Sequence, residues 1–264
     1  MGQKVAKLPP FLMSSVPKSG THLLHQILTG MPHISMDIKN PQKKFFFDAV
    51  NETEQYYANL YQDHSNRLSL LKENEFGLGH IRYTKEYASI LEKANMKHIF
   101  LRRDPRDVLV SMSYFIKDKW PEHPFHKDFQ SPHMTPKKRQ MALIKGEPGK
   151  WPDYSTYISG FYDWLNDKNT YSVSFEALMH SVQYQRSTLL NLTKFLWAEA
   201  TPPCTYEQMV KSMVANINQK TSATFRSGQI GGWKQEFDDE LKDAFKNNAG
   251  YLLRHYGYER DNNW

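Results

Sequence analysis

Three stretches of the chain place basic and hydroxyl side chains where they could bind an anion. The first is 17–21, Pro-Lys-Ser-Gly-Thr, between an apolar run and a segment with helical spacing. A tight turn at the amino end of a helix exposes backbone N–H groups in a region of positive potential. Lys18 adds a charge, and Ser19 and Thr21 add hydroxyl donors. The order differs from the nucleotide-binding G-x-x-x-x-G-K-[ST] loop, because here the lysine precedes the glycine.

The second stretch begins at Arg103 and ends at Ser111, about two helical turns further along. Arg103 follows an apolar run typical of a strand, and its guanidinium can hold a phosphate with two hydrogen bonds. Asp104 and Pro105 are residue types that favour the N-cap and the first position of a helix. The third stretch, 226–232, is rich in glycine, which permits close approach of the backbone to a phosphate. Alone, each of these two stretches also fits an ordinary capped helix or surface turn.

One histidine among the eleven in the chain has a position suited to proton transfer. His80 ends the segment 76–80, a predicted short strand whose tip lies on the ligand side. An unperturbed imidazole has a pKa of about 6.5, so it can accept a proton near neutral pH. His22 adjoins the first basic stretch, whereas we expect His98, inside a predicted strand, to be structural. Three others lie in a proline-rich segment and either line a binding site or face water: His123, His126 and His133.

The three stretches resemble, in the same order, three motifs of the cytosolic sulfotransferase family. Residues 17–21 are similar to the start of the family's P-K-S-G-T-T-W loop, and 103–111 to its 3′-phosphate segment. Residues 226–234 are similar to its R-K-G-x-x-G-D-W-K segment. Three ordered motifs are far more specific than one, and they span most of the chain. The resemblance implies an α/β fold of three layers, α/β/α, with a central parallel sheet like that of P-loop nucleotide triphosphatases.

The resemblance also implies a reaction and a co-substrate. Members of the family move a sulfuryl group from 3′-phosphoadenosine 5′-phosphosulfate (PAPS) to a hydroxyl or amine, without a metal. PAPS is anionic at both ends, which agrees with two separated anion sites. His80 is then the general base, and Lys18 the cation that stabilises the leaving phosphate. The implied donor-binding residues are Lys18, Ser19, Gly20, Thr21 and His22 at the phosphosulfate, Arg103, Ser111, Arg226, Ser227 and Gly228 at the 3′-phosphate, and Thr221 near the adenine.

Three residues depart from the family pattern. Leu23 stands where the family has a tryptophan that stacks on adenine, so we expect another ring there, with Phe225 and Trp233 as candidates. Leu78 stands where the family has a lysine two residues before its histidine. Phe175 replaces a tyrosine that contacts the base. We expect these departures to affect acceptor preference and rate rather than donor binding.

The elements that must position these residues alternate along the chain. Apolar runs predict strands at 11–16, 76–80, 97–101 and 171–175. Helical spacing predicts helices after the first three strands, and two more near 189–196 and 206–217. This alternation predicts a parallel sheet with helices on both faces, which binds ligands at the carboxyl ends of its strands.

A single domain, 1–264, accommodates this pattern. Two of its segments do not follow the alternation of strands and helices. We expect 39–75 to be helical and peripheral. Residues 117–155 hold many charges and prolines, so we expect a long loop there that serves as a lid or substrate loop.

Composition limits the alternatives. The chain has 264 residues, a net charge of +6 and one cysteine. The single cysteine excludes an internal disulfide and a cysteine-rich metal site. Since no apolar run is long enough to span a bilayer and no signal peptide begins the sequence, we expect a cytoplasmic protein that does not insert into membranes. The basic charge favours an anionic ligand.

Three other functions stay open on the sequence. A nucleotide-dependent phosphotransferase would need a strand-end aspartate for Mg²⁺, and none is evident. A nucleic-acid-binding module would fit the charge, but no groove-reading motif is present, so we expect no nucleic acid partner. A sulfotransferase homologue that binds the donor without catalysis would fit Leu78 and Phe175. The aromatic side chains of 117–155 are compatible with a small-molecule acceptor such as a phenol or alcohol, and the oligomeric state stays open.

Overall fold

A five-stranded parallel sheet forms the centre of the protein, in a computed structural model that describes residues 6–50, 52–218 and 228–264. The strands lie in the order β2-β3-β1-β4-β5. Their bounds are Phe11–Ser15 (β1), Lys44–Phe47 (β2), Phe76–Ile81 (β3), Lys97–Arg102 (β4) and Thr170–Ser174 (β5). β1 pairs with both β3 and β4, so strand order reverses beside β1, the place where open parallel sheets bind ligands.

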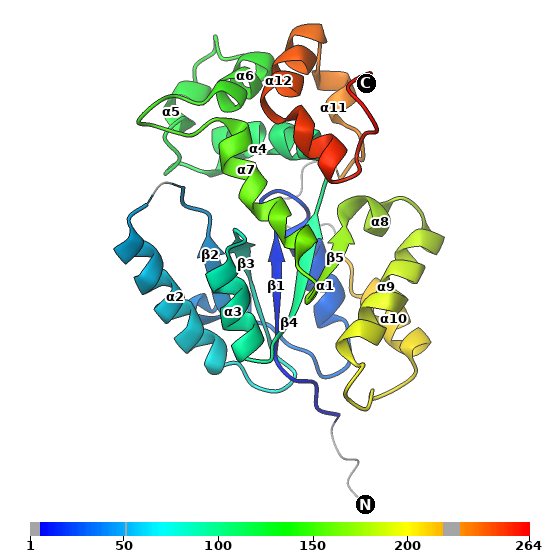
Figure 1. Cartoon of the computed structure of the whole chain (residues 1–264). Coiled ribbons are helices and arrows are strands. Elements are labelled where there is room, and N and C mark those ends of the chain that lie inside the picture. Colours follow the sequence, from blue (N-terminus) through cyan, green and yellow to red (C-terminus); the bar gives the residue numbers. More distant parts are fainter. Residues whose placement is uncertain (1–5, 51, 219–227) are drawn as a thin grey trace, which may run out of the picture.

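Helices cover both faces of the sheet, which confirms the predicted three-layer α/β/α class (Figure 1). On one face lie α2 (Glu54–Ser69), α3 (Lys85–Lys93) and α7 (Tyr154–Tyr162). On the other lie α1 (Thr21–Thr29), α8 (Phe175–Met179), α9 (Val182–Leu196) and α10 (Tyr206–Ala215). Successive residues of β1 point to opposite faces, so Leu12 joins the first core, and Phe11 and Met13 join the second.

A further group of helices lies beyond the carboxyl ends of the strands, at the top of Figure 1. Its members are α4 (Pro105–Lys119), α5 (His126–Phe129), α6 (Pro136–Lys145), α11 (Trp233–Glu236) and α12 (Asp239–His255). The first core continues from the sheet into this group through residues such as Leu109, Leu143 and Leu253. The strand ends therefore face a packed helical layer, and the candidate site lies between the two.

The prediction of a long loop at 117–155 was wrong. The segment contains the end of α4 and the helices α5 and α6. Pro136 occupies the first turn of α6, where its missing N–H costs nothing, and the Thr135 hydroxyl accepts a hydrogen bond from the backbone N–H of Lys138 at 3.3 Å. Leu143 and Ile144 are buried. At this position the proline therefore begins a helix rather than marking a loop, and the role of the segment as a lid stays a prediction.

The edge strand β2 was not predicted, because 39–75 was expected to be helical throughout. The helix α2 confirms part of that expectation, but residues 44–47 pair with β3. Three consecutive phenylalanines conceal the alternation of a strand: Phe45 and Phe47 are buried, whereas Phe46 is 45% exposed. At the other edge, β5 ends one residue earlier than predicted. The Ser174 hydroxyl caps α8 by accepting a hydrogen bond from the Ala177 N–H at 3.0 Å, so Phe175 is helical.

β2 can pair with β3 only because Gly79 has no side chain. A Cβ atom built on Gly79 would lie 1.5 Å from the backbone oxygen of Phe45, a distance that no side chain can occupy. Phe46 and His80 are partners in the register of these two strands. Gly79 therefore sets how closely the edge strand approaches the residue that carries the imidazole.

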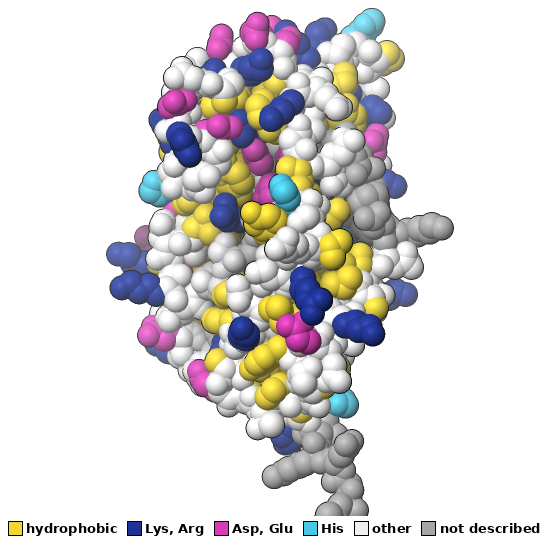
Figure 2. All heavy atoms as spheres, turned by 90° about the vertical axis from the view of Figure 1, so that its right-hand side faces the viewer, with side chains coloured by type: hydrophobic (Ala, Val, Ile, Leu, Met, Phe, Trp, Pro, Cys, Tyr) yellow, Lys and Arg dark blue, Asp and Glu magenta, His cyan; other side chains and the backbone are white. Residues whose placement is uncertain are grey.

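The face that Figure 2 shows lies over α8, α9 and α10. Lys and Arg side chains are dispersed over it, with acidic and hydrophobic side chains between them (Figure 2). The described side chains on this face therefore form no continuous basic stripe of the kind typical of a nucleic-acid-binding surface. Among the helices of 6–50, 52–218 and 228–264, none has the length and apolar character needed to cross a bilayer.

Candidate active site

The loop after β1 has the backbone geometry of an anion site. Gly20 is left-handed, with φ of 98°, and a Cβ atom there would lie 2.7 Å from the ring of Phe175, so both conformation and space require glycine. Lys18 also has a positive φ, of 68°. Gly20 is the N-cap of α1 and provides no side chain to cap it. The first N–H groups of α1 are therefore available to a ligand.

His80, at the end of β3, is positioned by Ser15 of β1. Its Nδ1 lies 3.0 Å from the backbone oxygen of Ser15 and 3.1 Å from the Ser15 hydroxyl. Because a carbonyl oxygen only accepts hydrogen bonds, Nδ1 carries the proton in neutral His80. Nε2 then keeps its lone pair, and it has no hydrogen-bond partner among the described residues. Burial, with a smaller effect of Lys18 and His22, lowers the pKa of His80 to about 4. The neutral imidazole can therefore accept a proton at Nε2.

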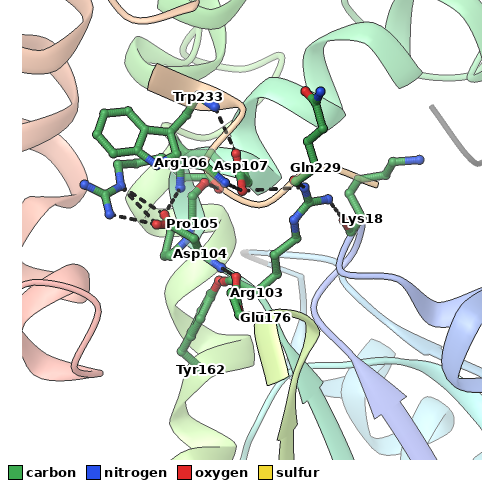
Figure 3. A network of polar contacts seen from close by, with 12 residues as sticks. Lys18, Arg103, Asp104, Pro105, Arg106, Asp107, Tyr162, Glu176, Gln229 and Trp233 are labelled. Carbon is green, nitrogen blue, oxygen red and sulfur yellow. Dashed lines mark hydrogen bonds and ion pairs between the residues drawn. The ribbon is translucent and has the colours of Figure 1, made fainter. Parts of the chain in front are cut away.

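Arg103 follows β4 directly and is 8% exposed (Figure 3). Its Nη2 donates to the backbone oxygen of Gln229 at 2.7 Å, and its Nη1 lies 3.4 Å from the backbone oxygen of Lys18. The guanidinium carbon lies 4.4 Å from the centre of the Phe175 ring. Arg103 thus lies between the loop after β1 and the glycine-containing segment that precedes α11.

Asp107, in the first turn of α4, holds that glycine-containing segment in place (Figure 3). Its Oδ2 accepts the Gly231 N–H at 2.8 Å, and its Oδ1 accepts the Trp233 N–H at 2.9 Å. Oδ2 also lies 3.5 Å from Nη2 of Arg103. Asp107 is 2% exposed, so these three groups together satisfy a buried carboxylate. The sequence analysis did not identify Asp107, because its partners are distant in the chain.

The turn from β4 into α4 is anchored from two other elements (Figure 3). The Tyr162 hydroxyl donates to the backbone oxygen of Arg103, and Oε1 of Glu176 accepts the Asp104 N–H at 2.8 Å. The Asp104 carboxylate caps α4, as predicted, and pairs with Arg106 at 2.7 Å. These contacts fix the direction in which Arg103 leaves the strand.

A cavity of about 420 Å³ at the strand ends brings most of the predicted site residues together. Those that line it are Lys18, Gly20, Thr21, His22, His80, Arg103, Ser111 and Gly228. Ser19, within the loop, is fully buried, and its hydroxyl has no hydrogen-bond partner among the described residues. Thr221, Phe225, Arg226 and Ser227 lie outside the described residues, so their roles stay predictions.

The three departures from the family pattern also lie at this cavity. Leu23, Leu78 and Phe175 all line it. Trp233, a candidate for stacking on adenine, does not: it is 5% exposed, and its ring packs 3.9 Å from the guanidinium carbon of Arg106.

The remaining histidines named above lie elsewhere. His98 is buried between the hydroxyls of Ser14 and Thr170, at 2.7 and 2.8 Å, which confirms a structural role. His123 is buried outside the cavity, and its Nδ1 accepts the Phe125 N–H at 3.1 Å. The part of the chain that the structure describes contains no group of three or more His, Cys, Asp or Glu side chains arranged to hold a metal ion.

Several cavity residues were missed by the sequence analysis. Lys44, Phe46 and Asp48 project from β2 and its end, and alternation along a strand would have found them had the strand been recognised. Phe115 and Trp120 come from the part of α4 beyond Ser111. Nζ of Lys18 lies 3.6 Å from the centre of the Phe115 ring. Burial raises the pKa of Asp48. The cavity thus combines basic side chains with aromatic ones, and Lys18 contacts one of the aromatic rings.

Comparisons with known proteins agree with this geometry. The family model described as "Sulfotransferase domain" matches residues 8–257. Sulfotransferase 1E1 of Mus musculus is 24% identical over 262 residues, which cover 91% of this chain and 82% of the relative. Sulfotransferase 6B1 of Mus musculus is 23% identical over 250 residues, which cover 91% and 76%.

Solved structures with the same fold include two that contain PAP, the nucleotide that remains when PAPS loses its sulfuryl group. One is mouse sulfotransferase SULT7A1 complexed with PAP, with a TM-score of 0.61, 18% identity and coverage of 93% of this chain and 84% of that one. The other is retinol dehydratase in a complex with retinol and PAP, with a TM-score of 0.58, 15% identity and coverage of 93% and 81%. At these identities the likeness concerns the fold.

Proposed function

Because the chain belongs to the sulfotransferase family, we propose that it moves a sulfuryl group from PAPS to a hydroxyl or amine of a small-molecule acceptor. The observation that carries the proposal is the single cavity shared by Lys18, Arg103 and His80. PAP, the desulfated product of PAPS, is present in related structures. One cavity that holds Lys18 and Arg103 beside a neutral imidazole suits a donor that carries several negative charges.

The donor-binding residues fit PAPS in charge and in unused hydrogen-bonding capacity. Lys18 and the first N–H groups of α1 would hold the phosphosulfate, with the hydroxyls of Ser19 and Thr21 as further donors. The unpartnered, buried hydroxyl of Ser19 supports this assignment. Arg103, whose buried Nε is also unpartnered, would hold the 3′-phosphate together with Ser111 and Gly228.

His80 would act as the general base. Ser15 orients its ring so that Nε2 can take the proton of the acceptor, while the donor supplies the sulfuryl group. Lys18 would stabilise the negative charge that develops on the leaving phosphate. No covalent intermediate is needed, because the acceptor attacks sulfur directly.

The acceptor would be a small molecule with an apolar or aromatic body. Phe46, Phe115 and Trp120 line the cavity, and they offer flat contact surfaces. Retinol dehydratase, a structural neighbour, binds the apolar alcohol retinol. We therefore favour a phenol or an alcohol as the acceptor class.

The test combines binding with turnover. Calorimetry should detect binding of PAP but not of ATP with Mg²⁺, and labelled PAPS should transfer its label to members of a panel of phenols and alcohols. His80→Ala should lower turnover by about 100-fold or more, because a positioned general base contributes roughly 10²–10⁴ in rate. PAP affinity should change little.

Three results would contradict the proposal. If ATP with Mg²⁺ bound and PAP did not, the protein would be a phosphotransferase candidate instead. If His80→Ala transferred sulfate at the wild-type rate, His80 would not be the general base. PAP binding without transfer to any acceptor would favour a non-catalytic homologue.

A further inference from the structure

The edge strand β2 carries a lysine that lines the cavity, and the residue paired with it on β3 is uncharged. Lys44 and Leu78 are partners in the register of the two strands, and both line the cavity. Phe45 and Phe47 point into the core on the α2 and α3 side, so alternation directs Lys44 and Phe46 to the opposite face. That is the face on which Leu78 packs. Lys44 therefore lies on the same side of the sheet as His80 and α1.

The surroundings of Lys44 favour an anion. Burial, with smaller effects of His25, Lys18 and Lys44, lowers the pKa of His22 in α1, so basic groups gather on this side of the cavity. Lys44 is partly buried. Its ammonium forms no ion pair with a described carboxylate, in contrast to the adjacent Lys43, whose Nζ lies 2.8 Å from Oε1 of Glu75. Asp48 also lines the cavity, but burial raises the pKa of its carboxyl. A partly buried cation that pairs with no described carboxylate can bind a negatively charged ligand.

We propose that Lys44 is a further catalytic residue, which contacts the sulfuryl oxygens during transfer and supplies from β2 the charge that Leu78 does not supply from β3. The proposal rests on the proposed function. Neighbouring strands lie about 4.8 Å apart, so a lysine side chain easily spans the distance between the two positions.

The charge that Lys44 would stabilise follows from the bonds that change. The acceptor oxygen forms a bond to sulfur while the bond between sulfur and the bridging oxygen of the donor breaks. The electron pair of the broken bond stays on the 5′-phosphate, which leaves as PAP, and the acceptor proton passes to Nε2 of His80. Lys18 lies on the side of the leaving phosphate, and Lys44 lies on the side of β2 and β3. Two cations therefore flank the group that moves.

Lys44→Met removes the charge and keeps much of the side-chain volume. We expect kcat for sulfuryl transfer from PAPS to a phenol to fall by about 100-fold, the usual loss when one stabilising donor is removed from a transition state. PAP affinity, measured by calorimetry, should change by no more than a few-fold. Lys43→Met is the matched control, because Lys43 pairs with Glu75 and does not line the cavity; its kcat should equal that of the wild type.

A second variant tests the position rather than the residue. Leu78→Lys introduced into Lys44→Met restores a cation at the paired position, and kcat should recover by at least about tenfold. Since Leu78 is 5% exposed, this lysine could disturb packing, so thermal unfolding is measured alongside. If the double variant does not fold, Lys44→Arg takes its place and should retain most of the activity.

Three outcomes would overturn the inference: a wild-type kcat in Lys44→Met, an equal loss of kcat and PAP affinity, or a folded double variant without recovery. None of these outcomes would contradict the proposed function, because each compares a variant with a wild-type protein that transfers sulfate. Failure of the proposed function has a different signature, namely a wild-type protein that neither binds PAP nor transfers sulfate.

Discussion

A single serine connects the imidazole to the anion loop. The backbone oxygen of Ser15 lies 3.0 Å from Nδ1 of His80, and its hydroxyl lies 2.7 Å from the hydroxyl of Thr21. β1 thus orients the proposed proton acceptor, His80, on one side and the proposed donor-binding hydroxyl of Thr21 on the other. Because Ser15 is fully buried, this link is protected from competition by bulk water.

The ionisation of the His80 side chain can be predicted directly from its surroundings. Burial lowers the pKa of His80 to about 4, so the ring should be neutral throughout the physiological range and become protonated only in acid. In the free protein, the NMR signals of the His80 ring should therefore stay constant between pH 5.5 and 8, with His80→Asn used to assign them. Bound PAP, which is anionic, should raise the pKa of His80. A titration midpoint near 6.5 in the free protein would contradict the structure.

Among the elements, the beginning of α4 has the widest influence on the site. β4 delivers Arg103, and the first turn of α4 delivers Asp107, which binds the segment before α11 through two backbone N–H groups. The same carboxylate lies 3.5 Å from Arg103. One strand–helix junction therefore orders two separate parts of the predicted 3′-phosphate site.

Asp107→Ala should show this coupling. Loss of the carboxylate leaves the Gly231 and Trp233 N–H groups without their acceptor, which should lower the free energy of unfolding by about 1–3 kcal/mol. PAP affinity should fall by roughly 10-fold or more. Calorimetry with PAP measures the affinity, and thermal unfolding measures the accompanying loss of stability. Asp118→Ala, at an exposed carboxylate that pairs with Lys117 at 3.1 Å, is the control. Unchanged PAP affinity in Asp107→Ala would separate Asp107 from the donor site.

At the scale of the whole molecule, the cavity joins parts that belong to different layers. Its walls come from α1 on one face, from the edge of the sheet, and from α4 in the helical group beyond the strand ends. A ligand that contacts Lys18 and Arg103 together would connect these parts. Binding should therefore stabilise the folded chain as a unit.

Thermal unfolding provides the corresponding prediction. At a PAP concentration 100 times its Kd, binding adds about 2.7 kcal/mol to the free energy of unfolding, and Tm should rise by roughly 5–10 °C. Adenosine 5′-phosphate, which lacks the 3′-phosphate, should produce a smaller shift at equal concentration, because it leaves Arg103 without its ligand. Equal shifts with the two nucleotides would argue against Arg103 as the 3′-phosphate site.

The sequence predicted the site best where local pattern and topology coincide. His80 ends a predicted strand and Lys18 and Arg103 closely follow two others, and parallel strands bring such ends together. The edge strand β2 escaped prediction because Phe45, Phe46 and Phe47 have similar side chains, so burial rather than residue type reveals their alternation. Asp107 escaped because its acceptor role depends on a segment more than a hundred residues away in the chain, a contact that only the folded structure defines.

The contact at Gly79 has a consequence for how tolerance to mutation would be interpreted. Any side chain at this position would collide with the backbone of Phe45 and displace the edge strand, and with it Lys44 and Phe46, from the imidazole. A saturation scan scored on activity would therefore rank Gly79 with the proposed proton acceptor, His80, although Gly79 contributes no functional group. Intolerance at this residue would report the spacing between two strands, not a chemical step.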